Sequence, residues 1–70
     1  MKIMQIPHEK FGSATDPETK MLEIREWCKE QGLIERKEFD CFYISSDKTY
    51  HIRFYGDGES IGGLFTKKFL

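Results

Sequence analysis

The stretch FDCFYISSDKTYHIRFY, residues 39–55, carries the strongest strand pattern in the chain. Its two halves, 39–45 and 49–55, are rich in the aromatic and β-branched residues that favour strands, and the polar residues 46–48 separate them. This pattern predicts a β-hairpin. Because side chains alternate between the two faces of a strand, the length of the loop determines which residues share a face.

We predict a three-residue loop at 46–48. This loop places the apolar side chains of both halves on one face, which becomes the core face: Phe42, Ile44, Tyr50, Ile52 and Phe54. A two-residue loop would mix apolar and charged side chains on both faces. The three-residue loop requires Lys48 to adopt a left-handed backbone conformation, which is uncommon for a residue other than glycine.

The residues before the hairpin predict one helix, in DPETKMLEIREWCKEQGL at 16–33. Asp16 has a side chain suited to the N-cap, Pro17 suits the first helical position, and Gly32 suits a left-handed C-terminal cap. Helical spacing brings four apolar residues onto one stripe: Met21, Ile24, Trp27 and Cys28. We expect this stripe to pack against the core face of the hairpin.

Two further strands complete the predicted fold. Residues 1–6, MKIMQI, form a short apolar strand that Pro7 ends. The sequence GDGE at 56–59 predicts a turn, and IGGLFTKKFL at 61–70 has the character of a last strand. The glycines here lack the G-x-G-x-x-G spacing of a phosphate-binding loop. The prediction is an α+β fold in a small single domain, 1–70, ordered β-α-β-β-β, with one helix on one face of an antiparallel meander sheet.

Size and composition limit the classes of function. The chain has 70 residues, 39% of them hydrophobic, which indicates one folded domain with a small core. It carries 11 basic and 12 acidic residues, a balance that argues against a strongly basic nucleic-acid-binding protein and against an acidic DNA mimic. No apolar run has the length of a signal peptide or of a membrane span. We expect a cytoplasmic protein with two reduced cysteines.

One helix covers only one face of the predicted sheet, so the other face stays open. In the predicted register this open face carries eight residues: Phe39, Cys41, Tyr43, Ser45, Thr49, His51, Arg53 and Tyr55. Tyr and Arg are enriched at binding hot spots, and Gly62, opposite Arg53, would leave a dent for a partner. We predict a partner-binding site formed by Tyr43, His51, Arg53, Tyr55 and Gly62. The alternative interpretation is an ordinary solvated sheet face.

These features predict a non-enzymatic binding module that acts on a protein partner, as an adaptor, inhibitor or modulator, or that associates with itself. A first alternative is that the same face binds single-stranded nucleic acid by stacking bases on its aromatic rings. A second alternative is that the acidic helix is the protein-binding surface, through Glu18, Glu23, Glu26 and Glu30.

No catalytic residue, cofactor or metal site is predicted. Cys41 and His51 would lie on a flat face that offers neither a pocket nor an oxyanion hole, and the cysteines and histidines lack the spacing of zinc ligands. With Cys28 in the core and Cys41 on the open face, we expect no disulfide and faster chemical labelling of Cys41.

Overall fold

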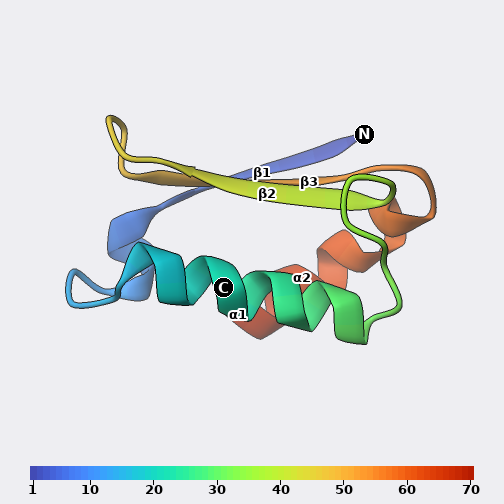
Figure 1. Ribbon diagram of the computed structural model, residues 1–70, viewed down its shortest axis with the longest axis horizontal. Helices are drawn as coiled ribbons and strands as arrows, with labels where there is room; N and C mark the ends of the chain where they lie inside the picture. Colours follow the sequence, from blue (N-terminus) through green and yellow to red (C-terminus); the bar gives the residue numbers. More distant parts are fainter.

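The computed structural model describes all 70 residues and confirms the α+β class in two layers. One layer is a three-stranded antiparallel sheet of β1 (Lys2–Pro7), β2 (Phe39–Ile44) and β3 (Thr49–Phe54), in the order β1-β3-β2. The other layer holds α1 (Pro17–Glu30) and α2 (Gly62–Phe69). Both helices lie on the same side of the sheet, so its opposite face is uncovered (Figure 1).

Helix α1 forms where the sequence predicts it and for the predicted reasons. The Asp16 carboxylate accepts a hydrogen bond from the Thr19 backbone N–H at 3.1 Å, and Gly32 follows the helix with a φ of 87°. Met21, Ile24 and Cys28 of the predicted stripe are buried. Trp27 is only half-buried, and its ring packs against α2 instead of the hairpin.

The hairpin forms, but its predicted register is wrong by one residue. Phe39 pairs with Phe54 and Cys41 with Ile52, so the loop has four residues, 45–48. Phe39 and Cys41 are therefore buried, whereas Phe42, 38% exposed, lies on the uncovered face.

The reason for this register is a charge. Asp40 shares a face with Phe42 and Ile44, and the predicted register would place its carboxylate inside the core, opposite Phe54. The observed register directs Asp40 outward, where it pairs with Arg53. Lys48 has the left-handed conformation that was expected, with a φ of 52°.

The predicted turn at 56–59 and the strand after it are also wrong. Residues Gly56–Ile61 form the 3-10 helix η2, and α2 follows directly. A last strand would need a free edge of β3, but β1 and β2 already flank β3 on both sides. Ile61, Phe65 and Phe69 recur every four residues, so a helix directs all three toward the core.

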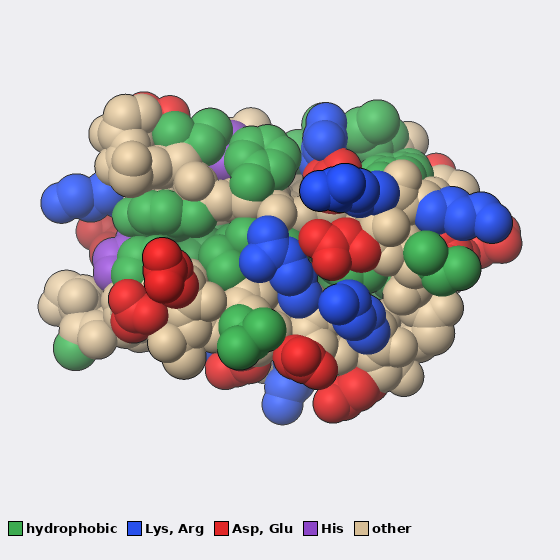
Figure 2. Space-filling model, viewed as in Figure 1, with side chains coloured by type: hydrophobic (Ala, Val, Ile, Leu, Met, Phe, Trp, Pro, Cys, Tyr) green, Lys and Arg blue, Asp and Glu red, His purple; other side chains and the backbone are tan.

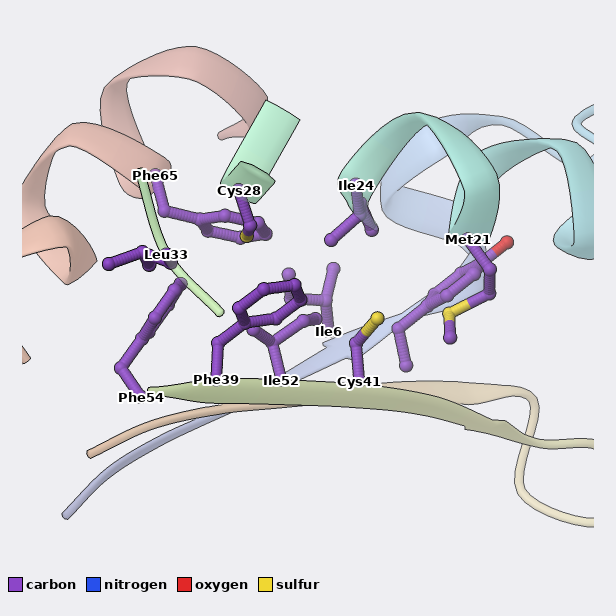
Figure 3. Packing of buried hydrophobic residues seen from close by; sticks show 11 residues of the cluster. Ile6, Met21, Ile24, Cys28, Leu33, Phe39, Cys41, Ile52, Phe54 and Phe65 are labelled. Carbon is purple, nitrogen blue, oxygen red and sulfur yellow. The ribbon is translucent and has the colours of Figure 1, made fainter. Parts of the chain in front are cut away.

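The core lies between the sheet and the helices and contains no charged residue. Figure 3 shows side chains of both layers meeting there. Its buried members are Ile6, Met21, Ile24, Cys28, Leu33, Phe39, Cys41, Tyr50, Ile52, Phe54 and Phe65. The Tyr50 hydroxyl satisfies its hydrogen bond with Nδ1 of His8 at 2.9 Å, on the short 3-10 helix η1 (His8–Phe11).

Candidate functional site

The uncovered face of the sheet, here called the outer face, takes alternate residues from the three strands. Ile3 and Gln5 come from β1, and the β3 side contributes Thr49, His51, Arg53 and the following Tyr55. The β2 members are Asp40, Phe42 and Ile44. Three of the five predicted site residues therefore lie together on this face: His51, Arg53 and Tyr55.

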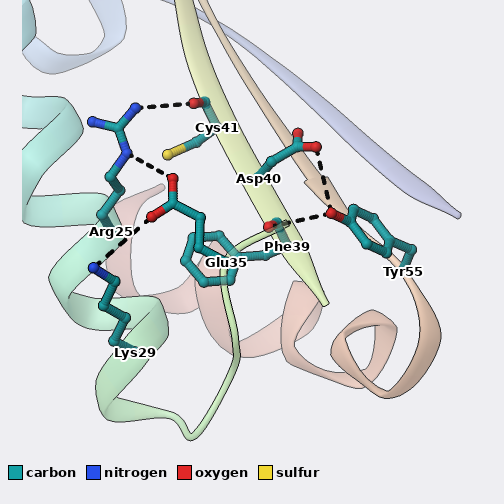
Figure 4. Close-up of polar contacts among 7 residues, drawn as sticks. All are labelled: Arg25, Lys29, Glu35, Phe39, Asp40, Cys41 and Tyr55. Atoms are coloured by element: carbon teal, nitrogen blue, oxygen red, sulfur yellow. Dashed lines mark hydrogen bonds and ion pairs between the residues drawn. The ribbon is translucent and has the colours of Figure 1, made fainter. Parts of the chain in front are cut away.

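A bidentate ion pair fixes Arg53 on the outer face. Its Nε donates to Asp40 Oδ1 at 2.8 Å and its Nη2 donates to Asp40 Oδ2 at 2.7 Å. The hydrogen bonds that Arg53 donates to Asp40, and then the charge of Asp40, raise the pKa of the Arg53 guanidinium above its ordinary value. The Tyr55 hydroxyl lies 3.4 Å from the Phe39 carbonyl oxygen and 3.5 Å from Asp40 Oδ2 (Figure 4). Desolvation, and then the charge of Asp40, raise the pKa of Tyr55, which keeps its hydroxyl protonated as a donor.

The Phe42 ring lies beside this ion pair. It stacks parallel to the His51 ring, with centroids 5.1 Å apart and an interplanar angle of 2°. The Arg53 guanidinium carbon lies 5.5 Å from the centroid of the Phe42 ring, within cation–π range. The outer face therefore presents one exposed aromatic ring whose neighbours hold it in place.

His51 also has a polar atom that the fold does not satisfy. Its Nε2 is shielded from solvent and has no hydrogen-bond partner. A buried polar atom without a partner costs about 1–3 kcal/mol. The stacked His51 ring therefore lowers the stability of the fold, relative to an apolar ring of the same shape.

The other two predicted site residues lie elsewhere. Tyr43 is on the core side of β2, where its ring packs against Tyr50 with centroids 4.8 Å apart and edge-on against His8. Gly62 is buried at the start of α2, with the aliphatic part of Lys2 directly over it. No dent therefore exists beside Arg53 at Gly62. Phe39 and Cys41, also expected on the open face, are in the core.

Sequence reasoning missed two members of the site, Asp40 and Phe42. The available signal was the charge of Asp40, which needs either solvent or a cation such as Arg53 across the hairpin. This requirement excludes the three-residue loop and places Phe42 on the outer face.

Charges are balanced on the side of the molecule that carries α1 and β2. Figure 2 shows basic and acidic side chains interspersed there, without a field of one sign. Glu35 lies between two cations, with Oε2 3.2 Å from Arg25 Nε and Oε1 3.8 Å from Lys29 Nζ (Figure 4). On the same helix Glu23 pairs with Lys20 at 3.0 Å. This surface therefore has little net charge with which to attract a charged partner.

The thiols are poor candidates for nucleophiles. Both cysteines are free and buried, and burial raises the pKa of Cys28 to about 12 and that of Cys41 to about 11. At neutral pH such thiols hold almost no thiolate, which is the reactive form. No group of three or more His, Cys, Asp or Glu side chains is arranged to hold a metal ion.

The largest hollow is a surface feature. It has a volume of about 590 Å³ and lies between the start of α1 and β2. Pro17, Met21 and Leu22 line it from the helix, and Phe42 and Tyr43 line it from the strand. The apolar surface of the outer face at Phe42 thus continues around the edge of β2. Neither helix has the length and apolar character needed to cross a lipid bilayer.

Comparisons with protein-family models, with curated proteins and with solved structures find no match to this chain.

Proposed function

We propose that the protein is a non-enzymatic module that binds another protein through its outer face, as an adaptor, inhibitor or modulator of that partner. The observation that carries this proposal is the exposed Phe42 ring, held between His51 and an Arg53 that Asp40 fixes in place. Aromatic and arginine side chains contribute most of the binding free energy at many protein interfaces.

Rigidity supports this function. Phe42, His51 and Arg53 project from paired strands, and their stacking and ion pairing hold them before any partner arrives. Binding therefore costs little additional side-chain entropy, which favours high affinity. Ile3, which is 55% exposed, extends the apolar surface onto β1.

The nucleic-acid alternative has weaker support. Arg53 is the one cation among the outer-face residues, and Asp40 neutralises it. A phosphate approaching this pair would meet the carboxylate of Asp40, and single-strand binders need several free cations along the backbone path. The acidic-helix alternative is also weaker, because Lys20 pairs with Glu23 on that helix.

The test combines capture of the partner with matched variants. Tagged protein is used to recover interacting proteins from the cells that express it, and the recovered protein is purified and titrated by calorimetry. We expect Phe42→Ala and Arg53→Ala each to weaken binding about tenfold or more, equivalent to about 1.4 kcal/mol. Leu64→Ala is the matched control, because Leu64 is a large apolar side chain, 49% exposed, on α2 in the other layer.

Three results would contradict the proposal. Binding that tolerates Phe42→Ala and Arg53→Ala but is lost in Glu26→Ala would place the interface on α1. A dissociation constant that rises steeply with salt, together with recovery of nucleic acid, would support the single-strand alternative. If Leu64→Ala and Phe42→Ala weakened binding equally, the loss of affinity in Phe42→Ala would not indicate binding at the outer face. Circular dichroism of each variant checks that the fold is retained.

A further inference from the structure

The two edges of the sheet differ in whether their backbone groups are already paired. Just before β2, the Glu38 carbonyl accepts a hydrogen bond from the Tyr55 N–H at 3.0 Å. Successive residues of an antiparallel strand direct their backbone groups alternately toward a neighbouring strand and away from it. Because Glu38 faces Tyr55, Phe39 and Cys41 direct their backbone N–H and C=O groups away from β3. The Phe39 carbonyl accepts from the Arg36 N–H at 2.6 Å, and the Cys41 carbonyl accepts from Arg25 Nη2 at 3.3 Å (Figure 4). Two outward carbonyls of the β2 edge are therefore already paired within the protein.

The edge of β1 is open. The His8 N–H donates to the Lys48 carbonyl at 2.8 Å. Because the backbone groups of successive residues alternate in direction, those of Ile3, Gln5 and Pro7 point away from β3. No backbone hydrogen bond involves the outward groups of Ile3 or Gln5, and both side chains are exposed. Pro7 has no N–H, so Ile3 and Gln5 supply the donors of this edge.

We propose that this edge pairs with the same edge of a second copy of the chain. The two β1 strands would run antiparallel about a two-fold axis at Met4, which places Ile3 opposite the partner's Gln5. Each subunit then donates two hydrogen bonds, from the amides of Ile3 and Gln5, and accepts two, so four form in all. The product is one continuous sheet of six strands, three from each subunit.

Three observations favour a second copy as the occupant. Pairing of β1 with β1 about a two-fold axis uses the same edge of both copies, and the β2 edge, with two of its carbonyls already paired, is less available for further pairing into a fibre. The net charge of −1 gives two copies little mutual repulsion. The paired stretch Ile3–Gln5 carries no charged side chain, and Lys2 lies over Gly62 of its own subunit.

The experiment removes one outward donor without touching the β1–β3 ladder. Gln5→Pro deletes the outward N–H, which β3 does not use, whereas Gln5→Thr keeps this N–H and suits a strand. Sedimentation velocity from about 1 µM to about 1 mM brackets the affinity range of weak dimers. We expect the unmodified chain and Gln5→Thr to dimerise within this range, and Gln5→Pro to dimerise at least about tenfold more weakly.

Hydrogen exchange adds a readout at the bonds themselves. The amides of Ile3 and Gln5 should become protected as the concentration rises, while those of exposed loop residues such as Asp47 should not. Thermal melting of dilute Gln5→Pro and Gln5→Thr verifies that both monomers are folded.

A chain that stays monomeric at about 1 mM, beyond the range of specific association, overturns the proposal. A dimer whose affinity is unchanged in Gln5→Pro overturns it as well, since that dimer uses another surface. The proposal goes beyond binding at the outer face and fails separately from it, because Phe42→Ala leaves the β1 edge intact.

Discussion

Replacing Gly63 by alanine should stabilise the protein. Gly63 is the second residue of α2, has no positive φ, and has no other atom within 4 Å of the position where a Cβ would stand. Alanine is favoured over glycine by about 1 kcal/mol in a helix interior, and by less in the first turn, so we expect a gain of about 0.5 kcal/mol. For a domain of this size the gain corresponds to a rise in melting temperature of about 2–4 °C.

Gly58→Ala is the opposing substitution. A Cβ at Gly58 would stand well inside contact distance of the Glu38 carbonyl oxygen, and backbone cannot move away as a flexible side chain can. The same carbonyl accepts the Tyr55 N–H at 3.0 Å, so displacing it also disturbs the end of the hairpin. Overpacking of this kind costs about 1–3 kcal/mol.

Urea denaturation, followed by Trp27 fluorescence, measures both variants against the unmodified chain. The midpoint should rise for Gly63→Ala and fall for Gly58→Ala, with equal slopes in both transitions. If residues 62–69 were a strand with Gly63 facing the core, the added methyl group would enter packed space and lower the midpoint. A lower midpoint for Gly63→Ala would therefore refute the helix, and an unchanged midpoint for Gly58→Ala would refute the close approach to Glu38.

Three further predictions follow from the core and the outer face. Phe65→Ala should lower the free energy of unfolding by about 3–5 kcal/mol, because Phe65 is fully buried, while Leu64→Ala beside it should change little in the same urea titration. Cys28 and Cys41 should both resist thiol reagents until the protein unfolds. Burial raises their pKa values from 9.0 to about 12 and about 11, so the protonated thiols stabilise the folded state fully below about pH 9. This stabilisation declines as the pH rises toward 11, by about 1.4 kcal/mol per thiol at pH 10, and melting curves at pH 8 and pH 10 measure the decline. Rapid labelling of Cys41 in the native state would contradict its burial. His51→Phe should stabilise the fold by about 1 kcal/mol, since it removes the unpaired Nε2 and keeps the stack on Phe42; a lower melting temperature would contradict this account.

Local signals were sufficient to predict α1. The residues that begin and end this helix lie within a few positions of the backbone groups that they affect: Asp16 at the N-cap, Pro17 at the first position and Gly32 after the last turn. Lys48 is left-handed as expected, although the expectation rested on a three-residue loop and the observed loop has four residues. Such features are readable from sequence because their physical cause is close by in the chain.

The sequence did not predict helix α2, because the reason why this segment is not a strand lies in β1, far away in the chain. The segment 61–70 has strand-forming residues and two glycines, so its local propensity does not favour a helix. β1, nearly 60 residues earlier, occupies the edge of β3 that a last strand would need. The spacing of Ile61, Phe65 and Phe69 was the one local indication of the helix, and it competed with an equally plausible alternation.

The outward placement of the candidate residues was predicted correctly on β3 and wrongly on β2, and the two outcomes have different causes. On β3, apolar and polar residues alternate without exception from Thr49 to Phe54, so His51 and Arg53 face outward for any loop length. On β2 both faces carry aromatic residues, and hydrophobicity alone does not choose between them. The choice falls to Asp40, whose ionised carboxylate is far costlier to bury than Phe42 is to expose. The charge that set the register thus also placed Phe42 beside Arg53, so the register and the candidate site have one physical origin.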